Sequence, residues 1–264
     1  MHIQAIPMFS DNYAYLVVDE STRDAVIIDP SQPSTVRPIL QSKIADGTIN
    51  LTAIVNTHHH HDHAGGNTEL RRLLNRPDLR IIGGTQCQAV DDTPSHGSTL
   101  PLGASVHLTA LHTPCHTQDS ICWYVRDTAP SGSADGREQR AVFTGDTLFI
   151  GGCGRFFEGS AAEMHRALNH VLAELPDDTH IYTGHEYTKS NARFALSVLK
   201  NPNVEALASF AQANDITQGR FTIGEEKKHN IFMMVGDGQV KSAVGETEPL
   251  AAMKKLRAMK DSFR

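Results

Sequence analysis

The sequence lacks several features that define whole classes of protein. It has no long basic run and a formal net charge of −6, which argues against nucleic-acid binding, since that depends on neutralising phosphates. No uninterrupted apolar run reaches the length of a membrane span, and residues 1–9 lack the charged and apolar regions of a secretory signal. We therefore expect a cytoplasmic protein that binds neither nucleic acid nor membrane. We also expect it to be a monomer.

Closely spaced cysteines and a serine nucleophile motif are also missing. The 4 cysteines show no C-x-x-C spacing, so neither a structural zinc ribbon nor a disulfide framework is indicated. There is no G-x-S-x-G stretch of the kind that presents a catalytic serine. Histidine, in contrast, is abundant, with 15 residues in a chain of 264. Where these histidines lie is therefore the main indicator of function.

Short apolar runs bounded by turn residues alternate with helical patterns, which indicates an α/β fold. We predict strands at 13–19, 24–29, 51–56, 79–83, 106–111, 121–125 and 141–143, and helices at 34–45, 67–74 and 161–175. After about residue 186 strand signals nearly vanish, and helices are predicted at 189–199, 204–213 and 250–263. We place a boundary near residues 175–188, between a domain of residues 1–180 and a helical domain of residues 181–264. The Gly- and Ser-rich segment 129–137 is predicted to be a surface hairpin insertion.

Residues 57–63 read T-H-H-H-H-D-H and follow the predicted strand 51–56. Side chains two apart in an extended segment point the same way, so His58 and His60 are expected on one side. Functional groups cluster at such strand ends in α/β proteins. Imidazole nitrogens there suit zinc, and also iron or manganese.

Asp62 and His63 follow in a predicted turn, so one segment can offer two ligands to one metal and two to a neighbouring one. His59 and His61 have the opposite strand parity, and for them we favour a solvated position. The alternative for the whole segment is a histidine-rich solvated loop with incidental metal affinity.

Three later segments also place a metal-competent side chain just after a predicted strand. They are residues 113–117, 144–147 and 183–186, and they carry His116, Asp146 and His185. A single loop His or Asp is usually just solvated. Four strand ends of this kind in one chain indicate a metal centre built from all of them.

The pattern T-H-x-H-x-D-H, followed by His, Asp and His at strand ends, resembles the metallo-β-lactamase superfamily. The stretches 145–149, 152–159, 184–187 and 256–263 resemble the glyoxalase II (hydroxyacylglutathione hydrolase) family. This resemblance implies an αββα sandwich with a C-terminal helical domain. It also implies a thioester hydrolase with two divalent metal ions, zinc first and iron or manganese as alternatives. Its reaction would be hydrolysis of S-D-lactoylglutathione to glutathione and D-lactate by a metal-bridging hydroxide, a step of methylglyoxal detoxification.

The resemblance also assigns roles to individual residues. The first metal would be held by His58, His60 and His116, the second by Asp62, His63 and His185, and Asp146 would bridge both. Asp62 and Asp146 would thus act in catalysis through the metal-bound hydroxide. Glutathione would be bound by Arg155, Phe157, Tyr187, Arg257 and Lys260.

The chain departs from the family pattern at a few positions. Cys115 stands where glycine usually precedes the site histidine, and Phe157 lacks the hydroxyl of the common tyrosine. Arg155 stands where lysine is common, and residues 230–234 have lost the Pro and Arg of N-P-F-x-R.

The last predicted helix gives evidence that is independent of the family. An apolar arc at 100° per residue contains Arg257 and Lys260, whereas Lys254 and Lys255 fall outside it. The arc itself is formed by Leu250, Met253, Leu256, Met259 and Phe263. Cations on a packing face are costly unless they are paired or reach out to water. Arg257 and Lys260 therefore either extend from the edge of the packed face to solvent or point into a cleft between the domains, toward an anionic substrate.

Two other functions fit part of the pattern. A persulfide dioxygenase of the same fold would use one iron and leave the second set of ligands empty. A non-catalytic metal-binding or sensing module would hold its ions coordinatively saturated. Metal analysis separates the first from a two-metal hydrolase, and thioesterase activity separates the second.

Overall fold

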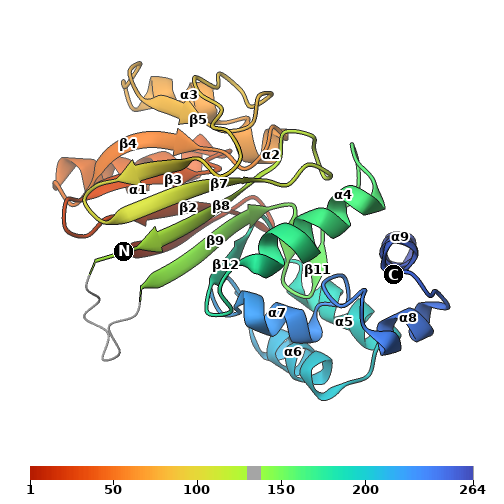
Figure 1. The fold of residues 1–264 in the computed structure, drawn as a ribbon. Coiled ribbons are helices and arrows are strands. Elements are labelled where there is room, and N and C mark those ends of the chain that lie inside the picture. Colours follow the sequence, from red (N-terminus) through yellow and green to blue (C-terminus); the bar gives the residue numbers. More distant parts are fainter. Residues whose placement is uncertain (130–137, 264) are drawn as a thin grey trace. The chain divides into compact units, whose positions relative to one another are not determined.

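The computed structural model describes residues 1–129 and 138–263 and divides the chain into two compact units (Figure 1). The first unit comprises Met1–His112 and Asp119–Gly145, and the second comprises Thr113–Gln118 and Asp146–Arg264. The predicted hairpin insertion at 129–137 lies almost wholly outside the described residues. Among the described helices, none is long and apolar enough to cross a membrane.

One sheet of the first unit has the strand order β1-β2-β3-β4-β5. The strands are β1 (His2–Met8), β2 (Asn12–Val18), β3 (Asp24–Ile28), β4 (Asn50–Val55) and β5 (Arg80–Ile82). β1, β2 and β3 pair antiparallel, and β3, β4 and β5 pair parallel. The helices between them are α1 (Pro33–Ala45), α2 (His61–Ala64) and α3 (Asn67–Leu73).

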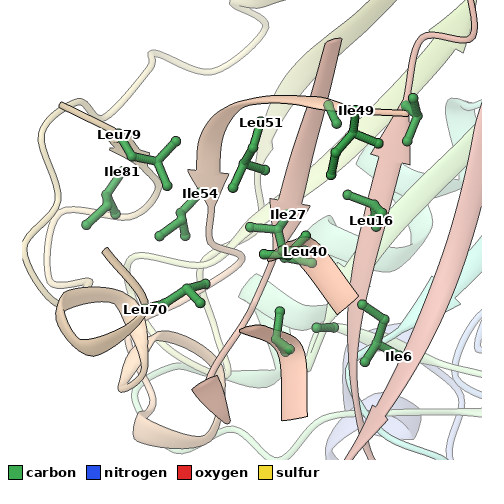
Figure 2. Close-up of a cluster of buried hydrophobic side chains, with 14 of the residues drawn as sticks. Ile6, Leu16, Ile27, Leu40, Ile49, Leu51, Ile54, Leu70, Leu79 and Ile81 are labelled. Atoms are coloured by element: carbon green, nitrogen blue, oxygen red, sulfur yellow. The ribbon is translucent and has the colours of Figure 1, made fainter. Parts of the chain in front are cut away.

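Side chains of α1 and α3 cover one face of this sheet. Leu40 of α1 and Leu70 of α3 pack with Ile27 and Ile54 of the strands in a buried cluster (Figure 2). The central strands read as nearly continuous apolar runs because both faces of the sheet are covered.

The other face packs on antiparallel strands that follow in the order β9-β8-β7-β6. They are β6 (Thr99–Leu102), β7 (Val106–His112), β8 (Ile121–Asp127) and β9 (Gln139–Gly145). The Tyr15 and Phe143 rings meet with centroids 5.2 Å apart, and the Trp123 indole donates to the Asn56 carbonyl at 2.9 Å. The end of β4 is thus packed between a helical layer and the second set of strands.

The second unit is mainly helical. It contains β10 (Leu148–Phe149), β11 (Gly152–Cys153), α4 (Ala161–Arg166), β12 (His180–Thr183), α5 (Thr188–Val198), α6 (Pro202–Ala213), α7 (Ile223–His229), α8 (Gly238–Val244) and α9 (Pro249–Ser262). Its core includes Phe194, Phe232 and Leu256, all buried. The predicted α/β class and the helical C-terminal part are therefore confirmed.

Some predictions about elements were wrong. The helix predicted over 161–175 is α-helical only to Arg166 and continues as a π-turn (Ala167–Val171) and a 3₁₀ turn (Leu172–Glu174). Asp62 and His63, predicted in a turn, belong to the one-turn helix α2. Strands β1, β6, β10 and β11 and helices α7 and α8 were not predicted.

A buried polar network fixes the β10–β11 hairpin to α7. The Glu226 carboxylate, fully buried, accepts from the Gly151 backbone at 3.0 Å and pairs with His229 Nε2 at 2.6 Å. The Asn230 amide donates to Glu226 and to the carbonyls of Phe149 and Gly152. Asn230 thus anchors the hairpin, although the Pro and Arg of the family motif around it are missing.

Candidate metal centre and substrate cavity

In the first unit, the segment after β4 gathers four of the predicted ligands. His58 and His63 are each 1% exposed, and their ring centroids lie 4.2 Å apart. His58 Nε2 lies 3.1 Å from His60 Nδ1, and His63 Nε2 lies 3.8 Å from Asp62 Oδ2. The structure therefore brings imidazole and carboxylate donors together, as zinc, iron or manganese prefers.

Asp29 orients two of these imidazoles and was not predicted. Its buried carboxylate accepts from His63 Nδ1 at 3.0 Å and from the Thr57 hydroxyl at 2.6 Å. That hydroxyl is therefore left to accept from His58 Nδ1, 3.1 Å away. Both rings are thereby held as tautomers that offer Nε2 to a cation, as is typical of metal-ligating histidines. A φ of 49° at Asp29 indicates that the backbone bears strain to place this carboxylate.

Replacing Asp29 with asparagine is expected to lower metal affinity about 30-fold, the range found for partners of ligating histidines. The amide can still accept one bond but no longer fixes both tautomers by charge. Competition with a chromophoric chelator measures the effect, and Asp46→Asn on the exposed surface is the control. Equal metal affinity in the two variants would contradict the orienting role.

The remaining residues of the histidine segment have other partners. The Asn12 amide donates to both the carbonyl and Oδ2 of Asp62, each at 3.1 Å. His59 Nδ1 lies 2.8 Å from Asp119 Oδ1. His61 is exposed on α2. The predicted division of the segment, with His59 and His61 as non-ligands, stays a prediction.

The second unit contains the other three predicted ligands, two of which are imidazoles that lie close to the carboxylate of the third. Nε2 of His116 lies 3.3 Å and Nε2 of His185 lies 3.4 Å from Asp146 Oδ2, and all three side chains are buried. His116 Nδ1 lies 3.0 Å from the Arg155 carbonyl, to which it donates, so its Nε2 is the nitrogen that can bind a metal. These donors again match a divalent cation of the zinc type.

Cys115, which departs from the family pattern beside His116, has its thiol engaged in a hydrogen bond. Its buried thiol lies 3.3 Å from the Ser160 carbonyl, to which it donates. Burial raises the pKa of this thiol to about 12, so it stays protonated at neutral pH. The extra sulfur is therefore compatible with the position of His116.

A cavity of about 440 Å³ in the second unit joins metal-competent and cationic side chains. Its lining includes two predicted metal ligands and all five predicted glutathione contacts: His116, Asp146, Arg155, Phe157, Tyr187, Arg257 and Lys260. Tyr187 stacks on His185 with centroids 4.8 Å apart, and the exposed Phe157 lies 5.1 Å from the His116 ring. The cavity thus offers aromatic walls and positive charge beside the carboxylate of Asp146.

The two cations of α9 are held by hydrogen bonds. Arg257 is almost buried and donates to the Cys153 carbonyl at 2.9 Å and to Asp261 Oδ1 at 2.8 Å. Lys260 Nζ donates to the backbone and hydroxyl oxygens of Ser190 at 3.1 and 2.8 Å. Both residues therefore have fixed side chains at the cavity wall.

We expect ligand binding to weaken as Lys260 loses its charge. Burial, followed by the nearby Arg257 and Arg193 charges, lowers the pKa of Lys260 to about 8. The ammonium is thus present below pH 8 and lost above it. In the wild-type protein, the inhibition constant of S-methylglutathione should rise between pH 7 and 9.5. This rise should exceed by about fivefold the rise in the Lys260→Arg variant, whose guanidinium stays charged. Identical pH profiles would contradict this expectation.

Two family models match the chain. One is described as the metallo-beta-lactamase superfamily and matches residues 9–80, and the other is described as the hydroxyacylglutathione hydrolase C-terminus and matches residues 186–263. The first match includes the histidine segment, and the second includes Tyr187, Arg257 and Lys260.

Relatives that match along their whole length show sequence similarity over the whole chain. A probable hydroxyacylglutathione hydrolase of Schizosaccharomyces pombe is 49% identical over 264 residues, covering 99% of this chain and 98% of that protein. The cytoplasmic hydroxyacylglutathione hydrolase of Arabidopsis thaliana is 38% identical over 270 residues, covering 100% of both. Among solved structures, ETHE1 from Myxococcus xanthus is similar with a TM-score of 0.66 and 27% identity, covering 100% of this chain and 96% of that one.

Proposed function

The chain belongs to the hydroxyacylglutathione hydrolase family of the metallo-β-lactamase superfamily, and we propose that it hydrolyses S-D-lactoylglutathione to glutathione and D-lactate. The predicted metallo-β-lactamase-type α/β sandwich with a helical C-terminal part is confirmed by the same likeness. The observation that carries the proposal is the cavity of the second unit, which is lined by His116 and Asp146 and also by Arg257 and Lys260. A metal-competent carboxylate beside cations suits an anionic substrate.

Superfamily membership and the clustered His and Asp side chains indicate divalent metal binding. We propose two ions, zinc first, with iron or manganese as alternatives. Their ligands would be His58, His60 and His116 for one, Asp62, His63 and His185 for the other, and Asp146 for both. When bound, two such ions would supply a hydroxide at neutral pH and electrostatic stabilisation for negative charge at the thioester carbonyl.

The residues of the chain position the substrate for this reaction. Arg155, Arg257 and Lys260 attract the two carboxylates of glutathione, and charge-assisted hydrogen bonds to these groups fix its orientation. The rings of Phe157 and Tyr187 enclose the apolar part of the cysteinyl group and exclude water from it. No general acid is required for the leaving group, because a thiol with a pKa near ~8.5 departs readily as thiolate.

The test is hydrolysis of S-D-lactoylglutathione by purified, metal-loaded protein, followed at the thioester absorbance. We expect turnover of this thioester, slow or absent turnover of β-lactams, and near two equivalents of metal per chain by elemental analysis. A single iron with oxygen uptake would support a dioxygenase instead. Tight metal binding without any thioesterase activity would support a non-catalytic module.

Three further proposals follow from the relatives. The boundary of a metal-binding domain at residues 1–180 and a substrate-binding domain at 181–264 is supported by the helical family model, which starts at residue 186. A cytoplasmic location is supported by the name of the Arabidopsis relative. We retain the monomeric state as a proposal, to be tested by analytical ultracentrifugation.

A further inference from the structure

Metal binding and carboxylate binding do not account for every charged residue that lines the cavity of the second unit. Among the described residues that line it, the Lys and Arg side chains are Arg155, Arg257 and Lys260. The acids are Asp146 and Asp261. Asp146 is accounted for as a proposed metal ligand. Asp261 pairs with Arg257, yet its charge would still repel a purely anionic substrate, so it suits a substrate that also carries a cation.

Asp261 has one oxygen committed and one open. Its Oδ1 lies 2.8 Å from a terminal guanidinium nitrogen of Arg257 and 3.5 Å from Arg155 Nε. Its Oδ2 accepts no hydrogen bond from any residue in the described parts of the chain, and the side chain is 43% exposed. Arg257 thus holds the carboxylate in place while Oδ2 remains accessible from the cavity.

Arg155 provides the opposite charge next to this oxygen. Its side chain is 60% exposed, and within the described structure its one ion pair is the long contact through Nε to Asp261. The terminal guanidinium nitrogens are therefore available to a carboxylate in the cavity. An exposed cation and an exposed anion stand side by side, which is the arrangement that matches a zwitterionic amino-acid head.

Glutathione carries such a head on its γ-glutamyl group, where an α-ammonium and an α-carboxylate share one carbon. We propose that Asp261 determines specificity by accepting a hydrogen bond from the α-ammonium while Arg155 binds the adjacent α-carboxylate. The proposal rests on the proposed hydrolysis of a glutathione thioester. It assigns the other carboxylate, that of the glycyl group, to Arg257 and Lys260.

The test compares two thioesters that differ only in the ammonium. One is S-D-lactoylglutathione, and the other is the D-lactoyl thioester of glutaryl-cysteinyl-glycine, which keeps both carboxylates and lacks the amino group. The wild-type protein should prefer the first by about fivefold in kcat/KM, mainly through KM, as expected for a partly exposed charged hydrogen bond. In Asp261→Asn, which keeps the shape and removes the charge, the preference should disappear, so that both thioesters have about the same kcat/KM. Asp215→Asn, an exposed acid outside the cavity, should keep the wild-type ratio.

The ratio of kcat/KM for the two thioesters distinguishes recognition of the ammonium by Asp261 from structural support of the two arginines. If Asp261 only holds Arg155 and Arg257 in place, the asparagine variant loses activity on both thioesters by one common factor and the ratio is unchanged, which overturns the proposal. Equal wild-type activity on both thioesters also overturns it and leaves the thioesterase function intact. Failure of the wild-type protein to hydrolyse either thioester would instead refute the proposed function.

Discussion

Replacing Asp146 with asparagine is expected to lower kcat/KM for S-D-lactoylglutathione by about 10³-fold, since metal stabilisation of transition-state charge is worth several kcal/mol. The Asp146 carboxylate lies between the Nε2 atoms of His116 and His185, and its side chain is largely buried. An amide there has no negative charge with which to offset a divalent cation. Elemental analysis should therefore show metal content below that of the wild-type protein, in step with the lost activity.

The matched control for this experiment lies within the histidine segment. His61→Ala removes an imidazole from the exposed face of α2, where alanine also suits the helix. It should leave metal content and activity near the wild-type values. If Asp146→Asn keeps full metal content and activity, or if His61→Ala loses them, the proposed ligand set is wrong.

The predicted ligands share one regularity in the sequence. His58, His116, Asp146 and His185 all follow a strand within a few residues, and strand ends are where an α/β scaffold presents side chains. The same rule would have selected Asp29, which directly follows β3. The predicted strand 24–29 included Asp29 as its last residue, whereas β3 ends at Ile28, so the sequence analysis did not place Asp29 after a strand end.

Contacts through space could not be predicted in this way. His116 donates to the carbonyl of Arg155 and Arg257 donates to that of Cys153, and carbonyl oxygens carry no sequence signal. The apolar arc of α9 did place Arg257 on a packing face, where it is indeed buried. Its ion pair with Asp261, one turn further on, satisfies the charge at that face.

The missed elements have physical reasons as well. Helix α7 has seven residues with charges on most of its surface, so its apolar periodicity is too short to detect. A capping box between Thr222 and Glu225 and the buried Glu226–His229 pair stabilise it instead. Both of these contacts are local, but the Glu226 carboxylate also accepts from the Gly151 backbone, a partner that a window of sequence does not contain.

The second large effect is expected from the cations of α9. Replacing both Arg257 and Lys260 with methionine should raise KM for S-D-lactoylglutathione by about 200-fold, equivalent to roughly 3 kcal/mol for two charge-assisted hydrogen bonds. Because the reacting carbonyl lies at the other end of the substrate, kcat should change by much less. Methionine retains an apolar stem for packing on Phe232 and Phe194, over which the two cations lie.

The other two lysines of the helix provide the control. Lys254 and Lys255 are exposed and do not line the cavity of about 440 Å³, so replacing both with methionine removes two positive charges from α9 but no cavity contact. If KM reflects only the net charge of the protein, both double variants should raise it equally and the effect should disappear at high salt. If the cations bind the substrate directly, the Arg257 and Lys260 variant alone should show the large increase. Its persistence at high ionic strength would then distinguish contact in the cavity from long-range attraction, because partly buried pairs are screened far less than exposed ones.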